Sequence, residues 1–498
     1  MSACSGEALS PSSSPRSAPA EPVAVACPDA PGSAVPVLVR YAPLAVLSAA
    51  AGLDAGGVAV LNSALPSMGT HFGTSAQNLS WAVTGYALAF AGLLLWGGAL
   101  ADRLRRRRVL AWGLVTVAAG AVLALVAPAF WLVVAGRVLQ GAGAAITMPA
   151  ATALLTSVYP SGPMRSRALG VFSAAQAGCY GAGLVLGGVI TSALGWRWVF
   201  ALQALAAVLT AVAAVRWLPR GTRHRRTRLD RTGTGALVAA IVLIVLSADT
   251  GSRTGGGPLA GVLLAAAAVS GYVWSRRGRS RDGDAVVLDR GLLRLPGVRT
   301  ATAVAGAFYF CVTGTLFLLP LYLQQVRGMS PASSGLAILP VSLAVAAAAL
   351  LSGRLMKSYG PRPLLASGIV LTAGGVLLWC TVGAHSPYAG AVLAGLIVTG
   401  IGQGVAFPAL TATGLRDVPG RAHGTASALT TTALQLGSAV GPTVLAGAGA
   451  GAGQAVGAGG GDALSLSGFH FAFAAAAGFL LLVGLPAAAR LGGTATPG

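Results

Sequence analysis

The stretch Gly98-Ala-Leu-Ala-Asp-Arg-Leu-Arg-Arg-Arg-Arg108 directly follows a long run of apolar residues. A related stretch, Gly353-Arg-Leu-Met-Lys-Ser-Tyr-Gly-Pro-Arg362, follows another apolar run late in the chain. Both stretches begin with a glycine and contain several basic side chains after it. Each stretch follows the second apolar run of a set of six, one set early and one late in the chain. The two stretches therefore indicate an internal repeat, and the apolar segments around them decide the fold.

The composition identifies those segments as membrane spans. The 498 residues are 55% hydrophobic and only 9% charged, whereas a soluble domain has about 25% charged residues. Several uncharged apolar stretches are about 20 residues long, enough to cross a hydrocarbon core of roughly 30 Å. The net charge of +21 does not indicate nucleic-acid binding, because the basic residues lie in short loops between apolar runs. We therefore expect an all-α polytopic membrane protein.

Apolar runs and the breaks between them predict fourteen transmembrane helices, arranged as six, two and six. The predicted division is a disordered cytosolic tail at 1–40, an N-terminal six-helix bundle at 41–218, basic loops with two inserted helices at 219–300, a C-terminal six-helix bundle at 301–489 with a Gly/Ala-rich external loop at 446–467, and a cytosolic tail at 490–498.

The distribution of basic residues supports this count. If the N-terminus is cytosolic, only Arg197, Arg253 and Arg327 fall on the outer side, while Arg137 lies within a span. The other basic residues all fall on the cytosolic side, as the positive-inside rule requires. We expect a multi-pass protein of the inner or plasma membrane with both termini in the cytosol.

Four motifs carry a resemblance to a known family. They are Leu53-Asp54 with Asn62-Ser-Ala-Leu-Pro66 in the first span, the Gly98 to Arg108 loop, Arg137-Val-Leu-Gln140-Gly141-Ala-Gly143 in the fourth span, and Gly170, Gly183, Gly187 and Gly188 in the fifth. Through them, residues 41 to 490 resemble the fourteen-helix drug:proton antiporters of the major facilitator superfamily. The resemblance implies the major facilitator fold, in which two six-helix bundles rock about a central site. It also implies export of lipophilic, often cationic, small molecules in exchange for protons.

The chain departs from the family pattern at four positions. Cys179 and Leu184 stand where the fifth-helix motif has glycine and proline. Arg105 replaces a glycine of the first loop, and Lys357 replaces an aspartate of the second.

Asp54 is the most informative residue of the sequence. It lies about 13 residues into an apolar run, roughly 20 Å from the predicted cytosolic end. A charge at that depth costs about 2.5 to 3.5 kcal/mol on insertion scales unless it faces a cavity or a partner. Arg137 reaches a similar depth, so an ion pair is geometrically permitted. We predict that Asp54 and Arg137 couple transport to protons, the alternative being that Arg137 only neutralises Asp54 as a structural strut.

The remaining candidate residues have three predicted roles. A substrate cavity is assigned to Asn62, Tyr86 and Gln140; a gating loop to Gly98, Asp102, Arg103 and Arg107; and an antiporter-motif helix to Gly170, Gly183, Gly187 and Gly188. The alternative for the loop is a simple stop-transfer run of charge. The alternative for the glycines is ordinary small-residue helix packing.

The sequence offers no set of residues for an enzyme. Its histidines lie in loops or at span edges and its five cysteines lack metal or paired spacing, so we expect no catalytic residues, metal or cofactor. A uniporter or symporter dedicated to one metabolite is the main alternative, whereas a channel would need a polar pore ring. The expected partners of this protein, taken as a monomer, are a small-molecule substrate, protons and the lipid bilayer, without nucleic acid.

Overall fold

The computed structural model describes residues 37–159, 163–219, 231–251, 257–277, 294–418, 423–455 and 464–490, and within these ranges all regular structure is helical. The α-helices are α1 (Val37–Phe72), α2 (Ala76–Arg103), α3 (Arg106–Leu125), α4 (Phe130–Val158), α5 (Pro163–Leu194), α6 (Arg197–Trp217), α7 (Arg231–Gly251), α8 (Gly257–Arg277), α10 (Pro296–Leu321), α11 (Pro331–Tyr359), α12 (Pro361–Leu378), α13 (Leu393–Leu415), α14 (His423–Ala455) and α15 (Leu466–Ala489). Short π or 3₁₀ turns flank three of them: η1 (Tyr322–Val326), η2 (Trp379–Thr381) and η3 (Tyr388–Val392).

Ten of the described helices are long and apolar enough to cross a membrane, so the chain is a multi-pass membrane protein. Two shorter apolar stretches, Val238–Gly251 in α7 and Pro258–Tyr272 in α8, fall below that length, and α2 and α14 are not among the ten. The all-helical membrane fold is therefore confirmed, while the count of fourteen spans stays a prediction.

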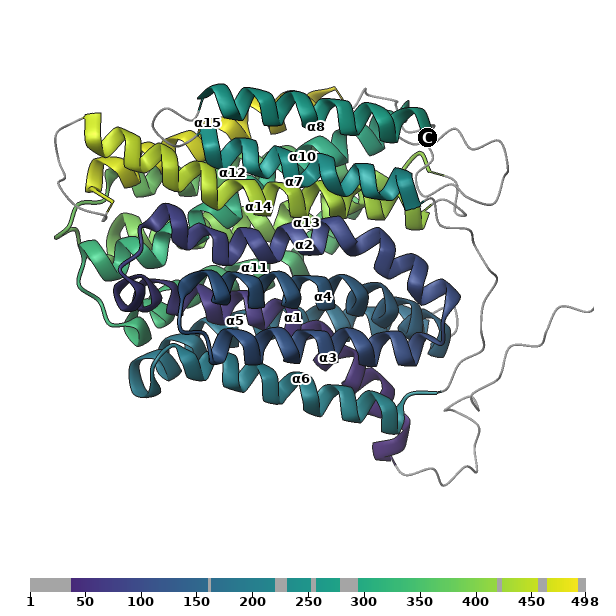
Figure 1. The fold of residues 1–498 in the computed structure, drawn as a ribbon. Coiled ribbons are helices and arrows are strands. Elements are labelled where there is room, and N and C mark those ends of the chain that lie inside the picture. Colours follow the sequence, from purple (N-terminus) through teal and green to yellow (C-terminus); the bar gives the residue numbers. More distant parts are fainter. Residues whose placement is uncertain are drawn as a thin grey trace, which may run out of the picture.

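The helices form two groups whose internal packing repeats (Figure 1). In the first group α1 packs on α5, α2 on α4, and α3 on both α4 and α6. The same pairs recur in the second group, where α10 packs on α14, α11 on α13, and α12 on both α13 and α15. The contacts between the groups are reciprocal, because α2 packs on α14 and the equivalent helix α11 packs on α5. This pseudo-symmetry is the three-dimensional form of the sequence repeat.

Glycines explain the close approach of the helices in one of the repeated pairs. On α3 and α4 a Cβ at Gly136 would lie 2.6 Å from the Gly120 oxygen, and one at Gly143 would lie 2.6 Å from the Gly113 oxygen. On α12 and α13 the corresponding approaches are 2.8 Å, between Gly375 and Gly395 and between Gly402 and Gly368. No larger side chain fits at these distances. Both pairs of helices therefore rely on glycines seven residues apart to bring their backbones together.

The inserted helices α7 and α8 run side by side (Figure 1), and α7 is the one that packs against both groups. α7 contacts both α2 and α14, and Val245 is buried against Ala87 of α2 and Ala439 of α14. The indole nitrogen of Trp81 on α2 donates to Asp249 on α7 at 3.2 Å. The insertion thus covers the seam between the two groups rather than standing apart from them.

Hydrogen bonds between the two groups gather at one end of the bundle, which we call the α1–α2 end because α1 ends and α2 begins there. Among the described residues they are Thr84 to the Ala439 oxygen at 2.8 Å, Thr84 to Thr443 at 2.8 Å, Ser80 to Thr443 at 3.2 Å, Gln324 to the Ser63 oxygen at 3.3 Å, and the Ala332 amide to Ser192 at 3.0 Å. Towards the opposite end, Gly170 on α5 and Gly353 on α11 have no neighbouring group within 4 Å of a Cβ position. The two groups are therefore closed against each other at the α1–α2 end.

The structure corrects two predicted boundaries. Residues 446–455 of the expected Gly/Ala-rich loop continue α14 as a helix, and α15 begins at Leu466. Small residues allow this, because Gly449 packs against the Gly468 backbone of α15. At the other terminus α1 begins at Val37, inside the expected tail. The rest of the predicted N-terminal tail, the end of the C-terminal tail and residues 456–463 lie outside the described residues.

Candidate functional site

Asp54 contacts a tyrosine rather than an arginine. It lies on α1, where its side chain is partly exposed, and its Oδ1 accepts a hydrogen bond from the Tyr86 hydroxyl of α2. Tyr86 itself is buried. The carboxylate therefore has a neutral donor from the neighbouring helix within the apolar span.

Arg137 lies on the far side of the same tyrosine. It is 1% exposed, its Nε donates to the Ala82 oxygen at 3.0 Å, and its guanidinium carbon lies 4.4 Å from the Tyr86 ring centroid. That position over a ring face is a cation–π contact. The structure shows no Asp54–Arg137 ion pair among the described side chains, because Tyr86 stands between the two charges. One terminal nitrogen, Nη2 of Arg137, has no hydrogen-bond partner there.

The hydrogen bonds of Arg137 continue to a residue that the sequence did not single out. Its Nη1 donates to Gln140 Oε1 at 2.6 Å, and Gln140 Nε2 donates to Gln203 Oε1 on α6 at 2.8 Å. Gln203 is 9% exposed. The only sequence signal for it is an amide side chain within a mainly apolar span, and that signal is too common to carry a prediction without the contact to α4.

A small cavity adjoins this chain of polar groups. Its volume is about 10 Å³, roughly the space that one water molecule needs. It is lined by Ala50, Leu53, Asp54, Tyr86, Leu114, Val117, Gln140, Ala144, Thr147 and Gln203. Asp54, Tyr86, Arg137, Gln140 and Gln203 thus form one buried polar cluster inside the first helix group, which we call the coupling cluster.

Asn62 lies apart from this cluster, towards the second helix group. It is buried on α1, and its Oδ1 has no hydrogen-bond partner among the described residues. Tyr180 of α5 lies beside Asn62 and also beside Tyr309 of α10, whose ring centroid is 6.4 Å from that of Phe407. Of the three residues assigned to a cavity wall, Asn62 is therefore at the boundary between the groups, whereas Tyr86 and Gln140 are inside the first group.

The predicted gating loop joins α2 to α3. A Cβ at Gly98 would lie 4.0 Å from Pro149 of α4, and Arg107 Nη1 donates to the Leu218 oxygen just after α6 at 3.1 Å. The side chains of Asp102 and Arg103 lie outside the described ones. Arg107 therefore ties α3 to α6, while a gating role for the loop stays a prediction.

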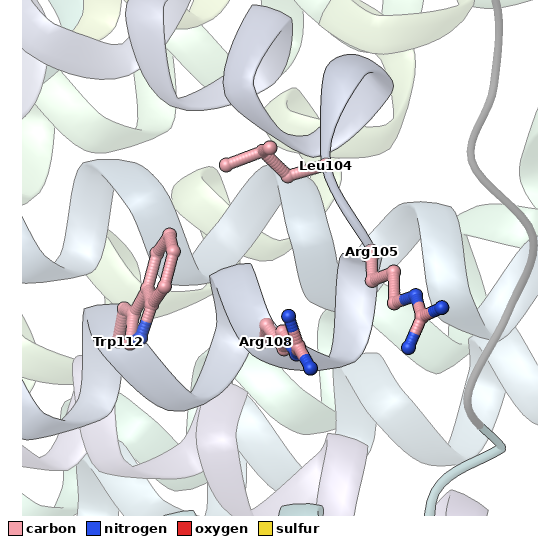
Figure 2. Close-up of a pocket in the computed structure, with 4 residues that line it drawn as sticks. All are labelled: Leu104, Arg105, Arg108 and Trp112. Carbon is pink, nitrogen blue, oxygen red and sulfur yellow. The ribbon is translucent and has the colours of Figure 1, made fainter.

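Two other arginines of this loop reach the surface instead. Arg105 and Arg108 are exposed, and with Leu104 and Trp112 they line a surface pocket of about 140 Å³ (Figure 2). The arginine that replaces the family's glycine at 105 thus contributes to the protein surface and not to the packing of α2 against α3.

The fifth-helix glycines face different partners. A Cβ at Gly183 or Gly187 would approach the backbone oxygens of Gly56 or Val60 on α1 to 2.7 and 2.5 Å, and Gly188 lies against Pro331 of α11. Gly170 meets nothing within 4 Å. Three of the four glycines thus serve close helix packing, and Gly188 does so across the two groups.

The two departures in this helix are accommodated by their neighbours. The Cys179 side chain lies against Gly52 of α1, where any side chain would collide with its sulfur. Leu184 is buried, and its backbone oxygen accepts a hydrogen bond from Ser63 at 2.9 Å while Gly335 of α11 packs on it.

Comparisons with known proteins agree with this architecture. Residues 47–442 match the Major Facilitator Superfamily. The chain is 32% identical to the probable actinorhodin transporter of Streptomyces coelicolor over 450 residues, covering 86% of this chain and 77% of that protein. It is 34% identical to the cephamycin export protein of Amycolatopsis lactamdurans over 398 residues, covering 78% and 80%.

Solved structures show the same fold at low identity. A bacterial homolog of the human lysosomal transporter Spinster, inward-facing and occupied, has a TM-score of 0.67 at 17% identity and covers 91% of this chain and 97% of its own. A peptide transporter in complex with sulfate has a TM-score of 0.65 at 15% identity, covering 90% and 94%.

Proposed function

Because the chain belongs to the Major Facilitator Superfamily, it is a transporter and not an enzyme, and we propose that it exports lipophilic or cationic drugs or antibiotics in exchange for protons. Relatives are named a cephamycin export protein, a puromycin resistance protein and a probable actinorhodin transporter, and these names support export and antibiotics as substrates. The protein acts as a monomer in the plasma membrane, with both termini in the cytosol.

One observation carries the proton-coupling part of this proposal: Asp54 is a carboxylate within an apolar span, and its side chain is partly exposed. When ionised, it attracts a cationic substrate. When protonated, it releases that substrate and keeps a neutral contact with Tyr86. Proton and drug therefore compete for one group, which is the minimum that exchange requires.

Arg137 supports this role by its position behind Tyr86. Its Nη2, which has no hydrogen-bond partner among the described residues, can donate a hydrogen bond to a carboxylate oxygen of Asp54 when the Tyr86 side chain moves aside. The ionised carboxylate then has a partner at a step when no cationic substrate is bound, so the cost of an isolated charge in the membrane is avoided.

The driving force is sufficient for export. A membrane potential of 100 mV supplies about 2.3 kcal/mol per proton and one pH unit supplies about 1.4 kcal/mol, or about 3.7 kcal/mol together. That free energy sustains a gradient of a few hundredfold for a neutral solute; for a monovalent cation the exchange moves no net charge, so the pH difference alone sustains a gradient of about tenfold.

A drug-susceptibility panel in an efflux-deficient host tests export, and drug-induced proton release from inverted vesicles loaded with a pH dye tests coupling. We expect Asp54→Asn to abolish proton-driven export of cationic drugs and Asp54→Glu to retain part of it. Asp417→Asn, which changes an exposed carboxylate next to α13, is the matched control. Proton-for-drug exchange at the normal rate in Asp54→Asn would show that this residue is not the coupling site.

A second candidate is a transporter dedicated to one metabolite. It is favoured by relatives that are named for single antibiotics. The same susceptibility panel separates the two, because a dedicated transporter protects against one chemical scaffold whereas a multidrug exporter protects against several.

A further inference from the structure

Gln203 behaves differently from the other polar side chain in the middle of α6. Thr210 bonds within its own helix, with its hydroxyl donating to the Ala206 oxygen at 2.7 Å. Gln203 instead bonds Gln140 of α4; it is 9% exposed and lines the small cavity beside Asp54. A helix that otherwise presents apolar residues thus contributes one amide to the coupling cluster.

The polarity of the two amides gives Gln203 a specific task. An amide side chain has one accepting oxygen and one donating nitrogen. Gln140 turns its oxygen to Arg137 at 2.6 Å and its nitrogen to the Gln203 oxygen at 2.8 Å. If the side-chain amide of Gln140 were rotated by about 180°, its nitrogen would face the Arg137 guanidinium, and two hydrogen-bond donors would then lie against each other. The same rotation would place the Gln140 oxygen against the Gln203 oxygen, so Gln203 and Arg137 together favour the orientation of Gln140 that binds Arg137.

The backbone of α1 leaves room for this arrangement. The Gln203 amide nitrogen occupies the place where a Cβ at position 57 would stand, so only glycine is compatible with it. Position 57 is three residues after Asp54, on the same helix. The helix that carries the carboxylate thus accommodates the amide that orients its cationic neighbour.

We infer that Gln203 is a positioning residue for proton coupling: acting through Gln140, it holds the Arg137 guanidinium against the Ala82 oxygen and the Tyr86 ring, and so keeps the hydroxyl of Tyr86 on Asp54. This inference rests on the proposed function. The ionisable groups that face the cluster are Asp54 from α1, Tyr86 from α2 and Arg137 from α4, while α3 contributes the apolar Leu114 and Val117.

The first test replaces the amide by an apolar side chain of similar size. In inverted vesicles, Gln203→Leu should shift the pH midpoint of drug-induced proton release by about half a unit or more and raise the KM for drug about threefold or more, because Arg137 is no longer fixed. Thr210→Val removes a polar group from the same helix and should leave both quantities unchanged. A wild-type midpoint together with a wild-type KM in Gln203→Leu would overturn the inference.

The second test displaces Gln203 from the opposite helix. Gly57→Ala should reproduce the midpoint shift of Gln203→Leu, since its methyl group takes the place of the amide nitrogen. If Gly57→Ala expresses poorly, the double variant Gly57→Ala with Gln203→Ala restores the space and should express normally while keeping the shifted midpoint. Gly271→Ala on α8, where nothing lies within 4 Å, is the matched control. A wild-type midpoint in the double variant would contradict the inference.

A double-mutant cycle shows whether Gln203 acts through Gln140. Gln203→Leu should have no further effect on KM in a Gln140→Leu background, whereas a side chain that merely packs would add its own effect. This cycle is measured by drug counterflow without a proton gradient. If the wild-type protein exchanges drug but releases no protons, the proposed proton coupling is wrong, while the cycle still tests whether Gln203 acts through Gln140. Additive effects of the two substitutions on KM would overturn the inference about Gln203.

Discussion

Tyr86 contacts both Asp54 and Arg137. Its hydroxyl donates to the carboxylate and its ring lies 4.4 Å from the guanidinium carbon, so one buried side chain contacts both charges. The hydroxyl and the ring do different things. A hydrogen bond to a charged group contributes about 1.5 to 3 kcal/mol, whereas the ring contact fixes the position of the cation.

The hydroxyl can be removed without the ring. Tyr86→Phe keeps the cation–π contact but leaves Asp54 Oδ1 without its donor, so we expect proton-coupled exchange to fall about tenfold, in line with the loss of one charge-assisted hydrogen bond. Measurement of drug-induced proton release checks this. Tyr359→Phe, at an exposed position on α11, is the control, and an unchanged exchange rate in Tyr86→Phe would mean that the hydroxyl is not used.

The same residues show what a sequence can and cannot predict about a site. Asp54 and Arg137 stand out because a charge in an apolar span is costly, and their similar depth follows from helix geometry. The bridging position of Tyr86 and the participation of Gln203 depend on which faces of α1, α2, α4 and α6 meet. Helix adjacency and side-chain direction are tertiary properties, so no spacing in the chain predicts them.

At the scale of the helices, closure of the α1–α2 end depends on α2 and α14. Thr84 and Thr443 are fully buried there, and Thr84 bonds both Thr443 and the Ala439 oxygen. Buried hydroxyls that pair across two helix groups favour one relative position of those groups, yet each neutral bond contributes only about 1 kcal/mol. Such a contact can hold the end closed and still be broken once in every transport cycle.

A disulfide at this contact tests whether the groups must separate. In a cysteine-free background, oxidation of the pair Ser80→Cys and Thr443→Cys, whose native hydroxyl oxygens are 3.2 Å apart, should stop export, and a reductant should restore it. The pair Thr313→Cys and Ser438→Cys replaces hydroxyls 3.1 Å apart within the second group and should leave export unchanged. Export that continues through the cross-linked α2–α14 pair would exclude separation of the groups at this end.

Helix boundaries show a different limit of sequence reasoning. The apolar runs predicted the order of the helices and their division into six, two and six, but not their ends. Residues 446–455 read as a loop because they are mostly glycine and alanine, yet they form the last turns of α14. In a membrane protein, glycine is a means of close helix approach as well as a helix breaker, and Gly449 makes such an approach to α15. Composition alone does not separate the two uses.

At the scale of the whole molecule, the topology of α7 and α8 decides how many times the chain crosses the membrane. Their apolar stretches, Val238–Gly251 and Pro258–Tyr272, are shorter than those of the ten clear spans. A surface hairpin would leave the orientation of both six-helix groups unchanged, because two helices return the chain to the side from which it came. Packing argues for a full crossing: α7 contacts α2 and α14, with Val245 buried between them and Asp249 bonded to Trp81 near the start of α2.

Reporter fusions separate the two topologies. Fusions after Arg220 and Arg281 should report the cytosol, and one near Gly457 should report the outside, because the basic residues place the loops in that order. A fusion after Arg253, between α7 and α8, decides the count. An outside signal there requires α7 and α8 to span the membrane and gives fourteen transmembrane helices. We expect this result because Asp249, near the end of α7, bonds Trp81 near the start of α2. The end of α7 therefore lies at the α1–α2 end, which the basic residues place outside. A cytosolic signal at Arg253 would leave a twelve-helix transporter with a surface hairpin, and a cytosolic signal at Gly457 would contradict both arrangements.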